Sequence, residues 1–200
     1  MNTTAADSSR KNFGRLTLSA FVLILLLQCI FSLAGIANLW QLGHNGYNGA
    51  AYQQGARNSL RFGLLFPAQY YCDRSKAPIS KKLYTHAPLA LHAHIVACTS
   101  LLGDSEWSVR LTPALYGVLA LIALLVIVKQ RWGDGQAVIA GAVYVLLPIN
   151  HSYANMVNHS TGFIFWSLLT LESYLRWTET PGTRHDNCKV WSSNRLISTG

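Results

Sequence analysis

The chain has 200 residues, of which 50% are hydrophobic and only 12% are charged, and its net charge is +8. Soluble domains carry about 25% charged residues, so this composition disfavours a soluble globular protein. A basic balance can indicate a nucleic-acid partner, but the Lys and Arg here lie at the ends of apolar runs and in one polar loop. That placement is typical of membrane anchoring and of contact with anionic lipid headgroups. We therefore predict an all-α integral membrane protein that contacts membrane lipids and no nucleic acid.

The first apolar segment follows a polar, basic N-terminus of residues 1–15. Residues 16–37 carry no charge and are long enough to cross a ~30 Å hydrocarbon core as a helix. A cleaved signal peptide is the alternative. Its apolar core would be shorter, at about 7–15 residues, and Ala34-Gly35-Ile36-Ala37 fits a cleavage site poorly. We expect an uncleaved helix whose basic flank keeps residues 1–15 in the cytoplasm.

A large polar and aromatic region, residues 38–110, follows this helix and is expected to form the first extracytoplasmic loop. Within it, residues 46–63 have helical spacing but are too polar to span, which predicts an amphipathic helix at the membrane interface. Residues 88–103 are apolar but short. If they crossed the membrane, the basic groups at 129–131 and at Arg176 would face outward, against the positive-inside rule. We therefore interpret 88–103 as an interfacial or re-entrant helix.

The second half of the chain predicts three further spans and a polar tail. Pro113 is expected in the first turn of the second span, where proline is tolerated. Counting the first helix, about four spans make up one membrane domain, residues 16–177, and the composition of 178–200 predicts disorder. The three further spans are residues 111–128, 137–149 and 161–174, with a cytoplasmic turn over 129–135.

The residues suited to chemistry gather on one side of this topology, because six of the seven histidines fall outside. His92 and His94 would point about 200° apart on a helix, so a shared metal site is not predicted, although a divalent ion remains an open alternative. Arginine presents a planar fork of donors that fits phosphate oxygens, so arginines beside aromatic residues predict phosphate binding. Headgroup snorkelling is the alternative reading for each of them. The arginines concerned are Arg57, Arg61 and Arg110.

Four motifs occur in order along the chain. They are His44-Asn45-Gly46-Tyr47-Asn48-Gly49-Ala50-Ala51-Tyr52, residues 56–63, Tyr84-Thr85-His86-Ala87-Pro88-Leu89 and residues 103–115. Over about residues 15–177 the chain resembles the N-terminal part of GT-C membrane glycosyltransferases, of the protein O-mannosyltransferase and aminoarabinose-transferase type. The resemblance implies a multi-helix enzyme that uses a polyprenyl-phosphate sugar donor. It also implies an acidic residue in the first outer loop that acts as the catalytic base.

The resemblance implies a site on the outer face of a bacterial inner membrane, with no resident cofactor. There, a hexose or pentose would pass from the lipid phosphate to an acceptor. His44 and His86 are the candidate catalytic residues that would line the reaction centre. No Asp or Glu occurs between Ala37 and Cys72, and a base must take up a proton at the working pH, so either His44 or Asp73 folding back would serve as the base. The candidate substrate-binding residues are Tyr47, Arg57, Arg61, Arg110, Asn158 and His159.

Two departures from the family pattern keep a second function open. The segment from Ala37 to Cys72 lacks the carboxylate that the family pattern places there. The chain also ends after about four spans, which suggests an N-terminal fragment of a longer enzyme. The alternative is a catalytically inactive membrane protein that binds polyprenyl phosphate or a partner protein.

Overall fold

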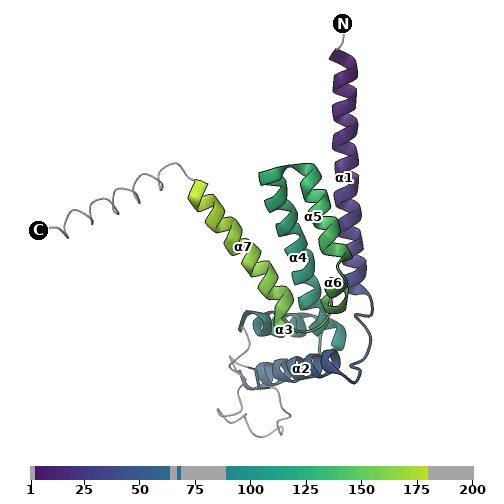
Figure 1. Cartoon of the computed structure of the whole chain (residues 1–200). Coiled ribbons are helices and arrows are strands. Elements are labelled where there is room, and N and C mark those ends of the chain that lie inside the picture. Colours follow the sequence, from purple (N-terminus) through teal and green to yellow (C-terminus); the bar gives the residue numbers. More distant parts are fainter. Residues whose placement is uncertain (1–2, 64–66, 69–88, 180–200) are drawn as a thin grey trace, which may run out of the picture.

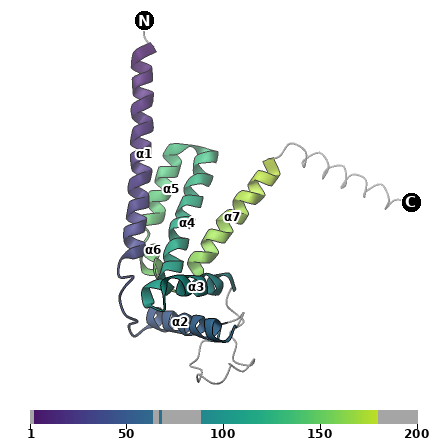
Figure 2. The ribbon, with the colours of Figure 1, turned by 180° about the vertical axis from the view of Figure 1, so that it is seen from behind.

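The computed structural model describes residues 3–63, 67–68 and 89–179, and these residues are helical with no strand among them. Figure 1, and Figure 2 from behind, show helices running side by side or splayed along one axis, with others lying across one end of this bundle. The helices are α1 (Thr3–Leu33), α2 (His44–Phe62), α3 (Leu89–Leu102), α4 (Glu106–Trp132), α5 (Asp134–Leu146), α6 (Pro148–Tyr153) and α7 (His159–Glu179).

Two of the lengthwise helices have the length and apolar composition needed to cross a membrane. These are α1, over Leu16–Leu33, and α4, over Glu106–Trp132. Helix α5 has 13 residues, which at 1.5 Å per residue gives about 20 Å and falls short of a ~30 Å core. The all-helical class is therefore confirmed for the described residues. The number of four spans stays a prediction.

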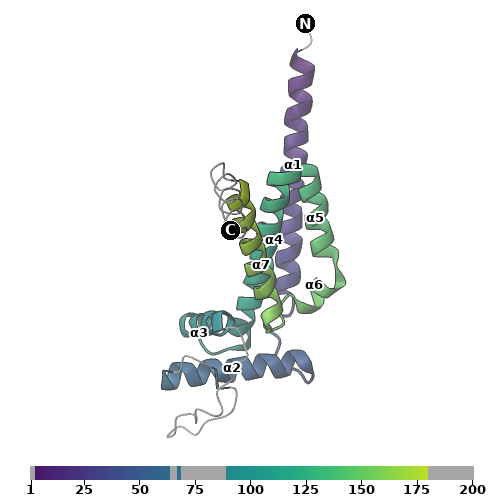
Figure 3. The same ribbon diagram turned by 60° about the vertical axis from the view of Figure 1, so that its left-hand side comes forward.

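Helices α2 and α3 form the layer across the end of the bundle, as Figure 3 shows from the side. Their bounds agree closely with the interfacial helices expected over 46–63 and 88–103. They pack on each other and on the N-terminal half of α4 through one apolar cluster, so α3 lies beside α2 and not along the bundle axis. The buried members of this cluster are Tyr52, Ala56, Leu91, Ile95, Val109, Tyr116 and Val157.

A second apolar cluster holds the bundle itself together and joins α1, α4 and α5. Gly141 of α5 allows close packing here, because a Cβ at this position would come 2.7 Å from Cδ2 of Leu125 and 3.2 Å from Cγ2 of Ile24. The buried members are Ile24, Leu121, Leu125, Ala137 and Val145.

Helix α4 begins earlier than expected because its N-terminus is capped by serines. The Ser105 side chain accepts a hydrogen bond from the Ser108 backbone N–H, and the Ser108 side chain accepts one from the Ser105 N–H, both at 3.4 Å. This reciprocal cap starts the helix at Glu106. Pro113 consequently lies inside the helix and not in its first turn, which corrects the expectation. It leaves the Val109 carbonyl without its usual helical donor.

The C-terminal part also differs from the expectation in its boundaries. The polar residues after 149 were expected to form a loop, but Pro148 begins the short helix α6, at a position where its missing N–H costs nothing. Helix α7 continues to Glu179, so residues 178–179 of the expected disordered tail are helical. The rest of that tail, 180–200, lies outside the described residues.

Candidate functional site

The glycine-rich start of α2 allows the preceding link, residues 38–43, to lie directly against the helix. A Cβ at Gly46 would come 1.7 Å from the backbone oxygen of Gln41, and one at Gly49 would come 2.1 Å from the ring of Trp40. Any side chain at either position would displace the link. The two glycines therefore fix Trp40 against the face of α2 that turns toward α4.

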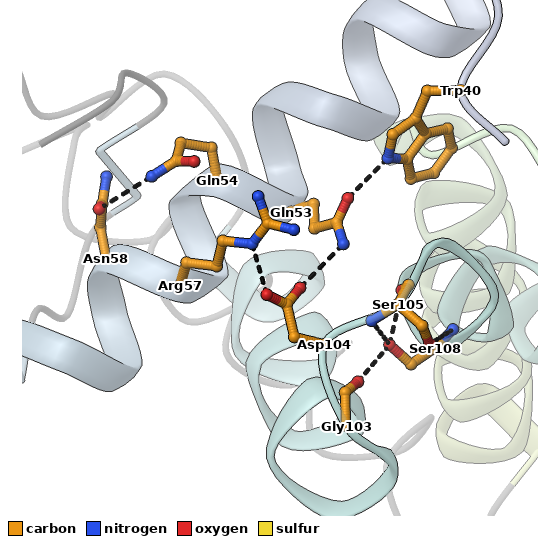
Figure 4. A network of polar contacts seen from close by, with 9 residues as sticks. All are labelled: Trp40, Gln53, Gln54, Arg57, Asn58, Gly103, Asp104, Ser105 and Ser108. Carbon is orange, nitrogen blue, oxygen red and sulfur yellow. Dashed lines mark hydrogen bonds and ion pairs between the residues drawn. The ribbon is translucent and has the colours of Figure 1, made fainter.

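A chain of polar contacts starts at Trp40 and joins three elements, as Figure 4 shows. The indole Nε1 of Trp40 donates to Oε1 of Gln53 at 2.6 Å, and Nε2 of Gln53 donates to Oδ1 of Asp104 at 2.8 Å. Arg57 completes the chain, since its Nε donates to Oδ2 of Asp104 at 2.5 Å in an ion pair. Gln53 is buried, whereas the side chains of Arg57 and Asp104 are 47% and 44% exposed. The carboxylate is thus fixed by two donors from α2 and still open to a substrate.

Arg110 holds the link from the other side. It is only 5% exposed, and its Nη1 donates to the backbone oxygens of Gly35 (3.1 Å), Ile36 (3.2 Å) and Asn38. Its guanidinium also lies 4.2 Å from the centre of the Trp40 ring, a cation–π contact. The arginine expected to bind phosphate is therefore engaged largely with the protein, and it ties α4 to the link between α1 and α2.

A polar cavity of about 190 Å³ lies beside this arginine, between the end of α1 and the start of α2. Amide side chains dominate its wall, and amides both donate and accept hydrogen bonds, as sugar hydroxyls do. Its polar lining residues are Asn38, Gln41, Asn45, Arg110 and Asn155.

The predicted catalytic histidine His44 is the first residue of α2 and is exposed. Its Nε2 lies 3.4 Å from Nδ2 of Asn48, one turn along the helix, at the long end of a hydrogen bond. The second predicted catalytic residue, His86, lies outside the described residues. His44 is near the cavity in sequence but is not among its lining residues.

The two histidines of α3 do different structural work. His92 is buried between α2 and α3, its Nε2 is 2.7 Å from Oγ of Ser59, and burial lowers its pKa to about 4. His94 is exposed and its Nδ1 lies 3.0 Å from the hydroxyl of Tyr116 and 2.6 Å from the backbone oxygen of Ala90.

In the part of the chain that the structure describes, no group of three or more His, Cys, Asp or Glu side chains could hold a metal ion.

The remaining predicted substrate-binding residues fall in two places. Tyr47 and Arg61 are exposed on α2, and the Arg61 guanidinium lies 5.5 Å from the centre of the Phe62 ring. Asn158 is buried at the start of α7, where its Oδ1 accepts from the Ser160 N–H at 2.8 Å and caps the helix. His159 follows it and is exposed. The structure thus brings together Arg57 and the link held by Arg110, and leaves the other residues apart.

The sequence prediction missed Asp104, Gln53 and Trp40. The carboxylate base was expected between Ala37 and Cys72, whereas the predicted outer loop extends over 38–110. Asp104 lies within that loop, on the turn between two expected helices and directly after Gly103. The signal was therefore available in the predicted topology.

Comparison with known proteins finds a family match for the second half of the chain. Residues 85–185 match the model of the family described as dolichyl-phosphate-mannose-protein mannosyltransferase. The match takes in α3 to α7, with Asp104 and Arg110, and does not reach α1 or α2. No curated protein and no solved structure matches the chain. Since the matched segment is half of the chain, the chain belongs to the dolichyl-phosphate-mannose-protein mannosyltransferase family of GT-C membrane glycosyltransferases.

Proposed function

We propose that the chain transfers a sugar from a polyprenyl-phosphate donor to an acceptor on the outer face of the membrane. The observation that supports this most directly is the layer of α2 and α3 across one end of the bundle. Arg57 and Arg61 are exposed one turn apart on α2, and the proposed orientation would put them near a lipid phosphate. The name of the matched family specifies a donor of this chemistry, a sugar joined through phosphate to an isoprenoid lipid.

The proposed orientation puts the N-terminus in the cytoplasm and the layer of α2 and α3 outside. Helices α1, α4, α5 and α7 would then be the four spans, with α6 extending the short α5 at its outer end. Figure 1 shows the start of α1 and the C-terminal ends of α4 and α7 at the end of the bundle opposite to α2 and α3. Lys129, Arg131 and Arg176 lie in the last turns of α4 and α7, so this end would be cytoplasmic by the positive-inside rule.

Each predicted residue has a place in this proposal. Arg57 and Arg61 bind the lipid phosphate, as guanidinium groups do, and Tyr47 covers the donor from the first turn of α2. His44 lines the reaction centre at the same helix end. Arg110 forms part of the wall of the polar cavity, which takes sugar hydroxyls.

The start of α7 completes the outer end in this proposal. His159 contacts the substrate from the first turn of α7, and Asn158 holds that turn in place. His86, which precedes α3 in the chain and lies outside the described residues, is the second catalytic residue in this proposal.

The test is sugar transfer by the purified chain in lipid vesicles. The donor is polyprenyl-phosphate mannose with a radiolabelled sugar, and the acceptor is a peptide rich in Ser and Thr. We expect labelled peptide from the wild-type chain and about tenfold less from His44→Ala, the scale of a lost polar contact at a reaction centre. His151→Gln is the control, because His151 packs on Phe31 and bonds the Val145 backbone oxygen, away from the donor.

Three outcomes separate the alternatives. Donor binding by the wild-type chain without any transfer would support the inactive lipid-binding protein instead. Equal transfer by the wild-type chain and His44→Ala would remove His44 from the site and leave the function standing. Absence of both binding and transfer would contradict the proposed function.

A further inference from the structure

A second cavity, of about 500 Å³, lies between the end of α5, α6 and the first turns of α7. Helix α6 places it at the end of the bundle that carries α2 and α3, as Figures 1 and 3 show. Its volume is within the range of about 300–1,000 Å³ that is usual for ligand sites. We propose that this cavity binds an uncharged lipid with a free hydroxyl, of the diacylglycerol type. The lining residues are Tyr144, Leu147, Ile149, Asn150, Tyr153, Ser160, Thr161 and Ile164.

Thr161 of α7 carries a hydroxyl without a partner in the wall of this cavity. The residue is only 5% exposed, and its Oγ1 has no hydrogen-bond partner among the described residues. Burying a hydroxyl without a partner costs free energy, and buried polar side chains in native proteins are nearly always hydrogen-bonded. A ligand oxygen inside the cavity would supply the missing partner.

Asn150 of α6 offers a hydrogen-bond acceptor to the same cavity. Its Nδ2 donates to Oε1 of Gln28 at 2.7 Å, and Nε2 of Gln28 donates to Oγ of Ser32 at 2.9 Å. Gln28 and Ser32 are completely buried, so these two bonds fix the orientation of the Asn150 amide. Within the described part of the chain no hydrogen bond uses the Asn150 Oδ1, and this oxygen is available to a hydroxyl of a ligand.

Two further groups in the wall complete the polar set. The Tyr144 hydroxyl donates to the backbone oxygen of Gly117 at 3.3 Å, so its own oxygen can still accept. Ser160 is exposed beside Thr161 and adds a second hydroxyl. The free hydroxyl of a diacylglycerol would accept from Thr161 and donate to Asn150, while its ester carbonyls would accept from Ser160.

The rest of the wall favours an uncharged lipid over a charged one. In the part of the wall that the structure describes no residue is charged, whereas the polar cavity includes Arg110. A phosphate group bound here would lose its water without gaining a cationic partner, which disfavours both phospholipids and the phosphate of the sugar donor. The apolar side chains of Leu147, Ile149 and Ile164 are exposed on the surface of the bundle. Acyl chains extending from the cavity would lie along them.

The experiment is photocrosslinking of the full chain in phosphatidylcholine vesicles. The probe is a diacylglycerol that carries a diazirine in one acyl chain, and mass spectrometry maps the crosslinked peptides. We expect crosslinks within residues 144–164 that unlabelled diacylglycerol removes. Phosphatidylglycerol, polyprenyl phosphate and the methyl ether of diacylglycerol should each compete at least about threefold less well, since the first two bring a phosphate and the third has lost the hydroxyl.

Thr161→Val tests the contact from the side of the protein. Valine keeps the shape of threonine but removes Oγ1, so the affinity for diacylglycerol should fall about threefold to tenfold, the scale of one neutral hydrogen bond. Because this hydroxyl has no partner in the chain itself, the variant should be at least as stable as the wild-type chain. Thr170→Val is the matched control, since the Thr170 hydroxyl donates to the Trp166 backbone oxygen farther along α7.

Five results would overturn the inference. They are crosslinks that lie outside residues 144–164, equal competition by phosphatidylglycerol, and equal competition by the methyl ether. The fourth is equal affinity of Thr161→Val and Thr170→Val for diacylglycerol. The fifth is stronger competition by polyprenyl phosphate than by diacylglycerol, which would assign the cavity to the lipid chain of the donor. Sugar transfer enters none of these measurements, so the binding site stands or falls independently of the proposed function.

Discussion

Both ends of the bundle carry an arginine–carboxylate network, and the two networks are built differently. The end of the bundle away from α2 and α3 is the inner end in the proposed orientation. There Arg131 of α4 donates to Glu172 and Glu179 of α7, and Glu172 accepts from Arg176 as well. The side chains of Arg131 and Glu172 are only 15% and 12% exposed. At the outer end the single pair of Arg57 and Asp104 is nearly half exposed.

The difference indicates what each network is for. The inner carboxylate is shared by two arginines and enclosed between α4 and α7, so its charge serves to hold α7 against the bundle. The outer pair leaves one edge of its arginine and one side of its carboxylate open to an incoming molecule. An enclosed network should therefore matter for stability, and an open one for activity.

Arg131→Ala tests the inner network and should have the largest effect on stability. It leaves Glu172 with only Arg176 as a partner, whose side chain is 62% exposed. We expect the free energy of unfolding in detergent to fall by more than it does when a single exposed ion pair is removed. The rate of sugar transfer per folded molecule should stay at the wild-type value.

Lys129→Ala is the matched control for this prediction. Lys129 pairs with Asp134 at 3.0 Å at the same end, but both side chains are well exposed. Such surface pairs contribute about 0–1 kcal/mol. Equal stability losses in Lys129→Ala and Arg131→Ala would break the distinction between an enclosed and an open network.

The His92 ring gives the end that carries α2 and α3 a pH dependence of its own. The unfolded chain takes up a proton on this histidine near pH 6.5, whereas burial keeps the folded pKa at about 4. The unfolded state therefore binds more protons between these values, and stability falls as the pH drops from about 6.5 to about 4. The full loss is about 3 kcal/mol.

The measurement is the free energy of unfolding in detergent at pH 7 and at pH 4.5, for the wild-type chain and for His92→Gln. Glutamine can keep a hydrogen bond to Ser59 but does not titrate. The variant should lose less stability between the two pH values than the wild-type chain does. A wild-type chain equally stable at both values would contradict a neutral buried ring.

The sequence was sufficient for the helices and insufficient for their contacts. Hydrophobic length and the distribution of Lys and Arg predicted the long apolar helices and an interfacial or re-entrant helix over 88–103, because these depend on local composition. The contact between Gln53 and Asp104 joins residues 51 positions apart, and nothing local in the sequence pairs them. Likewise, the engagement of Arg110 with three backbone oxygens of the link depends on how α4 meets α1.

Arg57→Ala should have the smallest effect on stability and a clear effect on donor binding. The exposed ion pair with Asp104 contributes no more than about 1 kcal/mol to folding. A charge-assisted hydrogen bond to the lipid phosphate is stronger, at about 1.5–3 kcal/mol, so the Kd for polyprenyl-phosphate mannose should rise at least about tenfold. Arg176→Ala is the matched control, because it removes the same charge from an exposed arginine at the opposite end. Weakened binding in both variants would mean that the net positive charge attracts the donor. Weakened binding in Arg57→Ala alone would place the phosphate of the donor at the outer end, beside Arg57 and Asp104.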